Sequence, residues 1–195
     1  SATADTNNDG DVDEVTVQFD EEIDDSNTFS NLDSSDVTLQ SGSVDSVDTG
    51  QTNNDDTIVL TVSPSSSGTD VKPSIRSDAS PATVQDEAGN TFTTSSTNEI
   101  TGTTDGAAPA PIDAATEYLD TNADGQVDAI DVDFSEDISS SSAEAGDFSL
   151  SGGDAGQVSI SSADASAGAG GDNSEVRLTV SGPQDDTDLG SITVG

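Results

Sequence analysis

Hydrophobic and polar residues alternate over short stretches along this chain, and the alternation predicts β-strands. In residues 14–19, the apolar side chains of Val15, Val17 and Phe19 are separated by polar ones, which is typical of an antiparallel strand with one buried face. Similar runs of Val, Ile and Leu follow, divided by turn-forming Gly, Pro, Asn and Asp residues. Short strands at a spacing of about 8–12 residues predict a β-sandwich, and no segment has a helical period.

The pattern occurs twice along the chain. Residues 120–138 (DTNADGQVDAIDVDFSEDI) repeat residues 5–23 (DTNNDGDVDEVTVQFDEEI), 115 positions apart, with eleven of the nineteen residues identical. Later in each copy, TIVLTVS at 57–63 matches EVRLTVS at 175–181. We therefore expect two tandem all-β domains, residues 1–104 and 112–195, joined by a Pro-containing connector over residues 105–111.

The second copy is shorter than the first. The first continues past Ile75 for about thirty residues, whereas the second stops at Gly195. We expect the second sandwich to lack its last strand or strands, which leaves a sheet edge that natural proteins rarely expose. Two explanations stay open: the chain is cut from a longer array, or a neighbouring molecule adds a strand beside Leu189–Val194.

The charge of the chain changes the picture of its environment. It carries 40 acidic residues against three Lys and Arg residues, a net charge of −37, with only 29% hydrophobic residues. This composition is also typical of disorder, but the regular alternation of β-branched residues argues against that reading. Because molar salt shortens the Debye length to about 3 Å, we interpret the acidity as adaptation to extreme salinity. Three scattered cations exclude a nucleic-acid partner.

The residues that are missing argue against catalysis. The sequence has no His, which removes the commonest general base, and no Cys, which removes thiolate chemistry and disulfides. No phosphate-binding glycine loop of the G-x-x-x-x-G-K-[ST] type is present. We expect a protein that is not an enzyme, and no membrane insertion within this segment, because no apolar stretch has the length of a span.

Each copy opens with an acidic loop of the form D-x-N-x-D-G-x-V-D that leads directly into a strand. Calcium loops place oxygen ligands at alternating positions around a Gly-containing turn, so this spacing predicts a structural calcium site in each domain. A twelfth-position Glu is absent, and no helix flanks either loop. The predicted ligands are Asp5, Asn7, Asp9, Asp11 and Asp13 in the first loop and Asp120, Asn122, Asp124, Gln126 and Asp128 in the second.

Other interpretations of these acidic residues remain open. Asn, Asp and Gly clusters form turns without any metal, so a bare acidic turn is the main alternative, and magnesium fits less well because it retains its waters. Asp86 and Asp105 lie near the connector and form a weaker candidate for an ion shared between the domains.

The loop-and-strand motif, the connector DGAAPAPIDAATEYLDTNADG and the turn VQDEAGN together resemble tandem Ig-like repeats of prokaryotic surface proteins, in a haloarchaeal style. The resemblance implies two tandem Ig-like antiparallel β-sandwiches in a calcium-braced segment of a cell-surface layer (S-layer), stalk or filament. It also implies an extracellular location and copies of the same chain or neighbouring repeats as partners. The alternative is an adhesin or binding module that recognises a glycan or protein through its loops.

Overall fold

The computed structural model divides the chain into two compact units, Ser1–Ala108 and Pro109–Gly195. The division falls within the predicted connector. The structure describes residues 1–24, 33–48, 54–77, 84–86, 88–90, 100–112, 116–153, 155–165, 173–182 and 190–194. Phe92, which belongs to the predicted first domain of residues 1–104, lies outside these residues.

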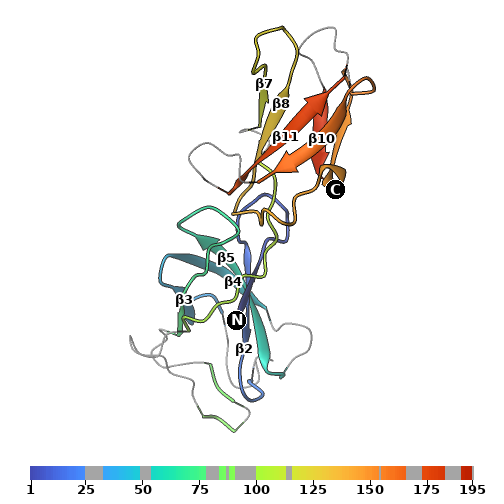
Figure 1. Cartoon of the computed structure of the whole chain (residues 1–195). Helices are drawn as coiled ribbons and strands as arrows, with labels where there is room; N and C mark the ends of the chain where they lie inside the picture. The colour runs from blue at the N-terminus through green and yellow to red at the C-terminus, as the bar shows by residue number, and fades with distance from the viewer. Residues whose placement is uncertain are drawn as a thin grey trace. The chain divides into compact units, whose positions relative to one another are not determined.

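The first unit contains two antiparallel sheets (Figure 1), and their buried side chains form one hydrophobic core. The larger sheet has the strand order β1-β2-β5-β4, and the smaller sheet pairs β3 with β6. An antiparallel bridge adds Ile100 beside Ile75 of β6, with two backbone hydrogen bonds of 3.1 Å. The strands are β1 (Ala2–Ala4), β2 (Glu14–Gln18), β3 (Val37–Leu39), β4 (Gly42–Asp48), β5 (Thr57–Pro64) and β6 (Ile75–Ser77).

The second unit repeats this arrangement. Its larger sheet has the order β10-β11-β8-β7, its smaller sheet pairs β12 with β9, and both are antiparallel. A short 3₁₀ helix, η2 (Ala145–Asp147), precedes β9. The strands are β7 (Glu117–Leu119), β8 (Ala129–Asp133), β9 (Phe148–Ser151), β10 (Ser159–Asp164), β11 (Glu175–Ser181) and β12 (Ser191–Val194).

The alternating pattern of the sequence builds the core of each unit. In the first, Val15 of β2 lies opposite Leu60 of β5, and both side chains are fully buried. In the second, Ile130 of β8 lies opposite Leu178 of β11 in the same way. Burial of such aliphatic side chains stabilises a fold by about 1.5–3 kcal/mol each. The central strand pair therefore anchors both units.

The edge strands β4 and β10 carry a bulge at the same place. The register shifts between Val44 and Ser46 in β4 and between Ile160 and Ser162 in β10. A bulge increases the local twist and interrupts the row of backbone groups that another chain would pair with. Each larger sheet thus has a blunted edge.

The predicted all-β class is confirmed, because the described residues form antiparallel sheets with η2 as the one short helical turn. The smaller sheet of the second unit has two strands among those residues, whereas Ile100 extends its counterpart in the first unit.

Residues at or next to the two ends of the predicted connector pair with the two units. Thr104 forms a parallel bridge with Ala2 of the first unit. In the second unit, Pro111 bridges Phe134, and the N–H of Ile112 donates to the carbonyl of Asp133 at 2.7 Å. The chain at either end of the connector is therefore paired with the unit that it adjoins.

Candidate cation loops

Each predicted cation loop connects the first two strands of a larger sheet. The first loop joins β1 to β2 and the second joins β7 to β8. Both are closed by equivalent backbone bonds: the N–H of Asp13 donates to the carbonyl of Ala4 at 3.1 Å, and that of Asp128 donates to Leu119 at 2.8 Å. The same two aspartates accept a bond from the adjacent central strand, from Val62 and Val180, each at 2.9 Å.

Asp5 organises the inside of the first loop. Its Oδ1 accepts from the N–H groups of Asn8 and Asp9 at 2.7 and 3.3 Å, and its Oδ2 accepts from Gly10 at 2.9 Å. Asp120 accepts in the same way from the N–H groups of Asp124 and Gly125, at 3.2 and 2.8 Å. The first carboxylate of the motif therefore gathers the backbone of each loop around itself.

The remaining side chains complete a chain of Asx turns. In the first loop, Asn7 Oδ1 accepts from the N–H of Asp9 at 2.8 Å, and Asp9 Oδ1 accepts from that of Asp11 at 3.0 Å. The second loop keeps the latter bond, from the Gln126 N–H to Asp124 Oδ1 at 3.0 Å. Side chains that accept from the backbone two residues on stabilise turns in this manner.

The glycine of the motif is required by the backbone. Gly10 and Gly125 have φ angles of 91° and 88°, a region that side chains with a Cβ rarely adopt. Two positions earlier, Asn8 and Ala123 also have positive φ angles, 58° and 60°. Asn tolerates this left-handed region, whereas Ala is strained there. The second loop therefore adopts the turn of the first with a less suitable residue.

The last aspartate of each motif binds a threonine that the sequence analysis did not single out. Asp13 accepts from the N–H and the hydroxyl of Thr6 at 3.0 and 2.8 Å. Asp128 accepts from the same groups of Thr121, both at 2.8 Å. The Thr121 hydroxyl, with the N–H groups of Thr121 and Asn122, lowers the pKa of the Asp128 carboxyl. Thr6 and Thr121 are identical residues at the same position of the repeat, and this identity could have marked them as part of the loops.

The two loops differ at the position after the glycine. Asp11 Oδ1 in the first loop accepts from the N–H of Gly68 at 2.8 Å. This contact ties the loop to the segment after β5. It lies beside an open hollow of about 290 Å³ that is lined by residues of the loop and by Val62, Ser63, Pro64, Ser66 and Ser67. Gln126 replaces Asp11 in the second loop. An equivalent carboxylate contact is thus specific to the first.

The loops contain the oxygen donors of a calcium site, but their carboxylates are turned toward the backbone. Among the described residues, no group of three or more Asp, Glu, His or Cys side chains has an arrangement that would hold a metal ion. The donor set is nevertheless all oxygen, and a carboxylate oxygen that accepts one N–H keeps a second lone pair. The residues therefore fit calcium by chemistry, and binding would require their side chains to converge.

The acidic residues near each loop have other partners. Asp131, at the twelfth position of the second loop motif, forms a two-bond pair with Arg177 at 2.7 and 2.5 Å. Asp105 forms an ion pair with Lys72 at 3.5 Å, whereas Asp86 accepts from Asn90. Each carboxylate of the weaker ion candidate thus has a partner of its own within the first unit.

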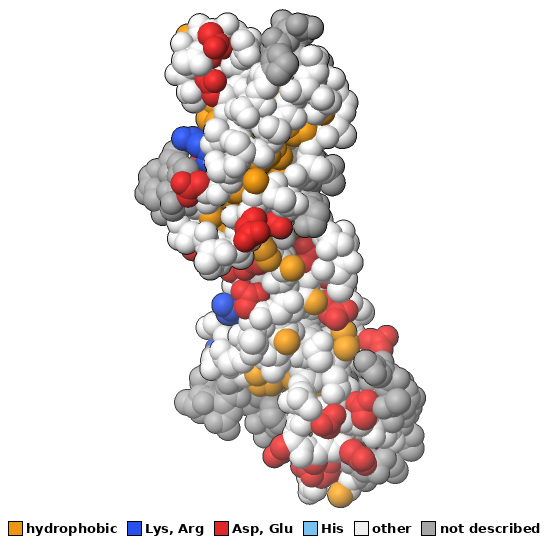
Figure 2. Space-filling model, turned by 45° about the vertical axis from the view of Figure 1, so that its right-hand side comes forward, with side chains coloured by type: hydrophobic (Ala, Val, Ile, Leu, Met, Phe, Trp, Pro, Cys, Tyr) orange, Lys and Arg blue, Asp and Glu red, His pale blue; other side chains and the backbone are white. Residues whose placement is uncertain are grey.

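On the face shown in Figure 2, acidic side chains are exposed on both units and basic ones are rare. The part of the chain that the structure describes contains no helix of the length and hydrophobicity that a bilayer span needs. The sequence matches no protein-family model, and comparisons with curated proteins and with solved structures found no match. The two loops and the sheets they join are therefore the basis for a functional assignment.

Proposed function

We propose that this chain is a structural segment of an extracellular layer, stalk or filament, built from tandem Ig-like sandwiches and braced by calcium. The observation that supports this most directly is the repetition of the loop. Both units place the same acidic turn between the first two strands of the larger sheet, with the same closing bonds to Asp13 and Asp128. A recognition site usually varies from repeat to repeat, whereas a repeated brace serves the framework.

Calcium would act on the approach to the central strand. In each loop, the motif begins one residue after the first strand and ends just before the second, and its Val12 or Val127 side chain is buried. An ion held by the loop oxygens would fix the position of β1 against β2 and of β7 against β8. It would also offset the repulsion among carboxylates that the high net charge creates.

Calcium titration in molar NaCl tests this function. At a calcium concentration of 100 times Kd, one site stabilises the folded state by about 2.7 kcal/mol, so the Tm of both transitions should rise. Asp9→Ala with Asp124→Ala should abolish the rise. The matched control is Asp48→Ala with Glu117→Ala, which removes the same charge from exposed strand positions. If calcium does not change the Tm of the parent chain, the calcium-binding part of the proposal is wrong.

We propose copies of the chain or neighbouring repeats as its partners. This partner is supported by a comparison of the smaller sheets. In the first unit, Ile100 pairs with Ile75 of β6. The strand of the second unit that is equivalent to β6 is β12, and its described ladder is with β9. A strand beside β12 would complete the second sheet by β-augmentation. A density map of the assembled form should show that strand next to residues 191–194. A stable monomer in which hydrogen exchange protects the outer edge of β12 would argue against it.

A second candidate function is an adhesin or binding module. It is favoured by two large apolar side chains that the second unit exposes, Tyr118 at 41% and Ile112 at 39%. Aromatic rings are suited to stacking on sugars. Glycan-array binding that Tyr118→Ala abolishes would favour this function, whereas no binding would leave the structural one.

A further inference from the structure

The first and last described segments of the first unit lie side by side. β1 pairs with β2 on one side, and a parallel bridge joins Ala2 to Thr104 on the other. The N–H of Thr3 donates to the carbonyl of Thr104 at 3.0 Å, and the N–H of Thr104 donates to the carbonyl of Ser1 at 2.9 Å. The chain therefore leaves this unit along the strand by which it enters.

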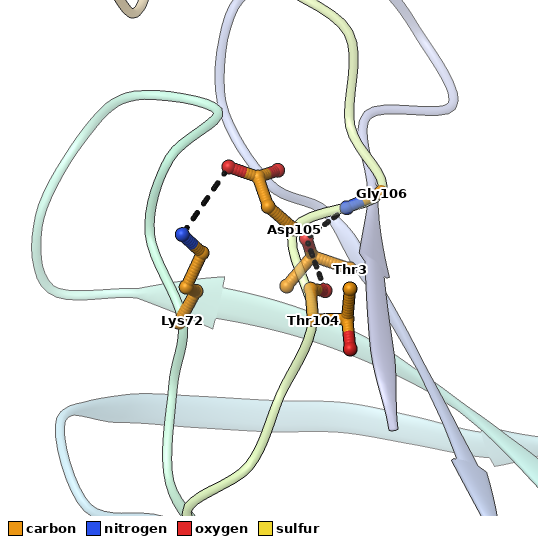
Figure 3. Close-up of polar contacts among 5 residues, drawn as sticks. All are labelled: Thr3, Lys72, Thr104, Asp105 and Gly106. Atoms are coloured by element: carbon orange, nitrogen blue, oxygen red, sulfur yellow. Dashed lines mark hydrogen bonds and ion pairs between the residues drawn. The ribbon is translucent and has the colours of Figure 1, made fainter.

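Side chains reinforce this backbone pairing (Figure 3). The buried hydroxyl of Thr3 accepts from the N–H of Gly106 at 3.2 Å and lies 3.4 Å from the Thr104 carbonyl, to which it donates. The hydroxyl of buried Thr103 donates to the Pro73 carbonyl at 2.9 Å. These bonds fasten residues 103–106 both to β1 and to the body of the unit.

The glycine at position 106 allows the close approach. A Cβ on Gly106 would lie 2.6 Å from the carbonyl oxygen of Thr3, which is too short for any real contact. Gly102, four residues earlier, has open space around the same position. A side chain at 106 would therefore separate the two segments, whereas one at 102 would leave them in place.

The direction of the pairing determines how it responds to tension. In a parallel pair, the beginning of β1 and the end of residues 103–106 lie at opposite ends of the pairing. Force applied through the two ends of the unit then loads all of its bonds together, in shear. An antiparallel pair pulled from one end would instead lose its bonds one after another.

We propose that the pairing of β1 with residues 103–106 is a mechanical clamp that sets the resistance of the first unit to stretching. The proposal deepens the structural role proposed above, because a segment of a stalk or filament transmits tension through its ends.

Single-molecule stretching of the full chain in molar NaCl with a calcium chelator tests the clamp. The chain has no Cys, so terminal cysteines provide unique handles, and the longer first unit is identified by the length it releases. Thr3→Val, which removes the bonding hydroxyl, should accelerate its unfolding at constant force about fivefold, and Gly106→Ala should do so by more. Thr3→Ser and Gly102→Ala should behave like the parent.

A second pulling direction separates a clamp from a general loss of stability. Handles at Gln40→Cys and Ser65→Cys lie at one end of the antiparallel β4–β5 pair, where force peels those strands without loading β1. There, Thr3→Val should leave the unfolding rate unchanged. Equal acceleration in both directions, or none in the end-to-end direction, would overturn the clamp. The chelator keeps the outcome independent of the calcium brace, whose own test is the titration.

Discussion

The central strand pairs of the two units carry the same kind of buried residues and differ on their opposite face. Toward the core, Val15 and Leu60 correspond to Ile130 and Leu178. On the other face, the first unit pairs Thr16 with Val59, whereas the second pairs Asp131 with Arg177. The core face therefore keeps aliphatic residues in both units, and the outer face carries two unrelated chemistries at one register position.

The Asp131–Arg177 pair shows how a charged residue on the outer face can still be buried. Asp131 is only 8% exposed there, and its carboxylate accepts hydrogen bonds from Nε and Nη2 of Arg177. Asp131 raises the pKa of the Arg177 guanidinium through these bonds. In a chain with only three basic residues, this cation is paired with one of the buried carboxylates.

Both units need a glycine where the two edge-side strands of the larger sheet come close together, but the glycine lies on a different strand in each unit. In the first, Gly42 at the start of β4 lies opposite Pro64, and a Cβ there would lie within 2.4 Å of the Ser63 carbonyl. In the second, the glycine is Gly182, just after β11, where a Cβ would meet the Gln157 carbonyl. The two strands approach closely in both units, and the absence of a Cβ on one strand or the other makes this approach possible.

The largest expected effect tests whether the two cores are equivalent. Leu60→Ala and Leu178→Ala each remove a fully buried side chain and should destabilise their own unit by about 3 kcal/mol. Unfolding followed by denaturant should show one transition shifted and the other unchanged. Ile112→Ala, at a side chain that is 39% exposed, is the control, with a change of about 0.5 kcal/mol or less. A shift of both transitions would mean that the units do not unfold separately.

The need for a glycine at the close approach of the two strands is tested by Gly42→Ala in the first unit and Gly182→Ala in the second. Both positions have φ angles far from those that alanine adopts, 121° and 140°, and both lack room for a Cβ. Each substitution should cost about 2 kcal/mol, in the first and second transition respectively. Gly156→Ala, where a Cβ meets nothing, is the matched control. A neutral Gly182→Ala would show that the second unit does not need the close crossing.

The outer-face pair is tested by exchanging it for the residues of the first unit. Arg177→Val alone leaves the largely buried Asp131 carboxylate without its cation, so the second unit should lose about 1–2 kcal/mol. Adding Asp131→Thr restores the Thr–Val pair and should recover most of that loss. Denaturant unfolding of both single variants and the double variant measures the coupling. Additive losses would show that the two side chains stabilise the sheet independently.

The comparison also explains how much the sequence predicted. Alternation at Val15, Val17, Ile130 and Val132 was sufficient for the strands and cores, because burial on one face imposes a period of two. The internal repeat marked the acidic loops. It did not reveal that Thr6 and Thr121 close them, because a hydroxyl between acidic residues has no pattern of its own. Nor did it predict that Thr104 pairs with Ala2, because no periodic signal links such distant segments.

The smallest expected effect is a shift in the pKa of one loop carboxyl, that of Asp128. Hydrogen bonds from Thr121 lower the pKa of Asp128, so its contribution to stability is present above the unfolded pKa of about 3.9 and is lost as the pH falls through the lower folded value. Thr121→Val removes the hydroxyl and should raise the Asp128 pKa toward the ordinary value, as followed by carbon-detected NMR titration. Asp86, whose pKa is lowered by Asn90 in the other unit, should not change. An Asp128 pKa that ignores the substitution would mean that the backbone N–H groups of Thr121 and Asn122 alone hold this carboxylate, and that the loop closes without its threonine hydroxyl.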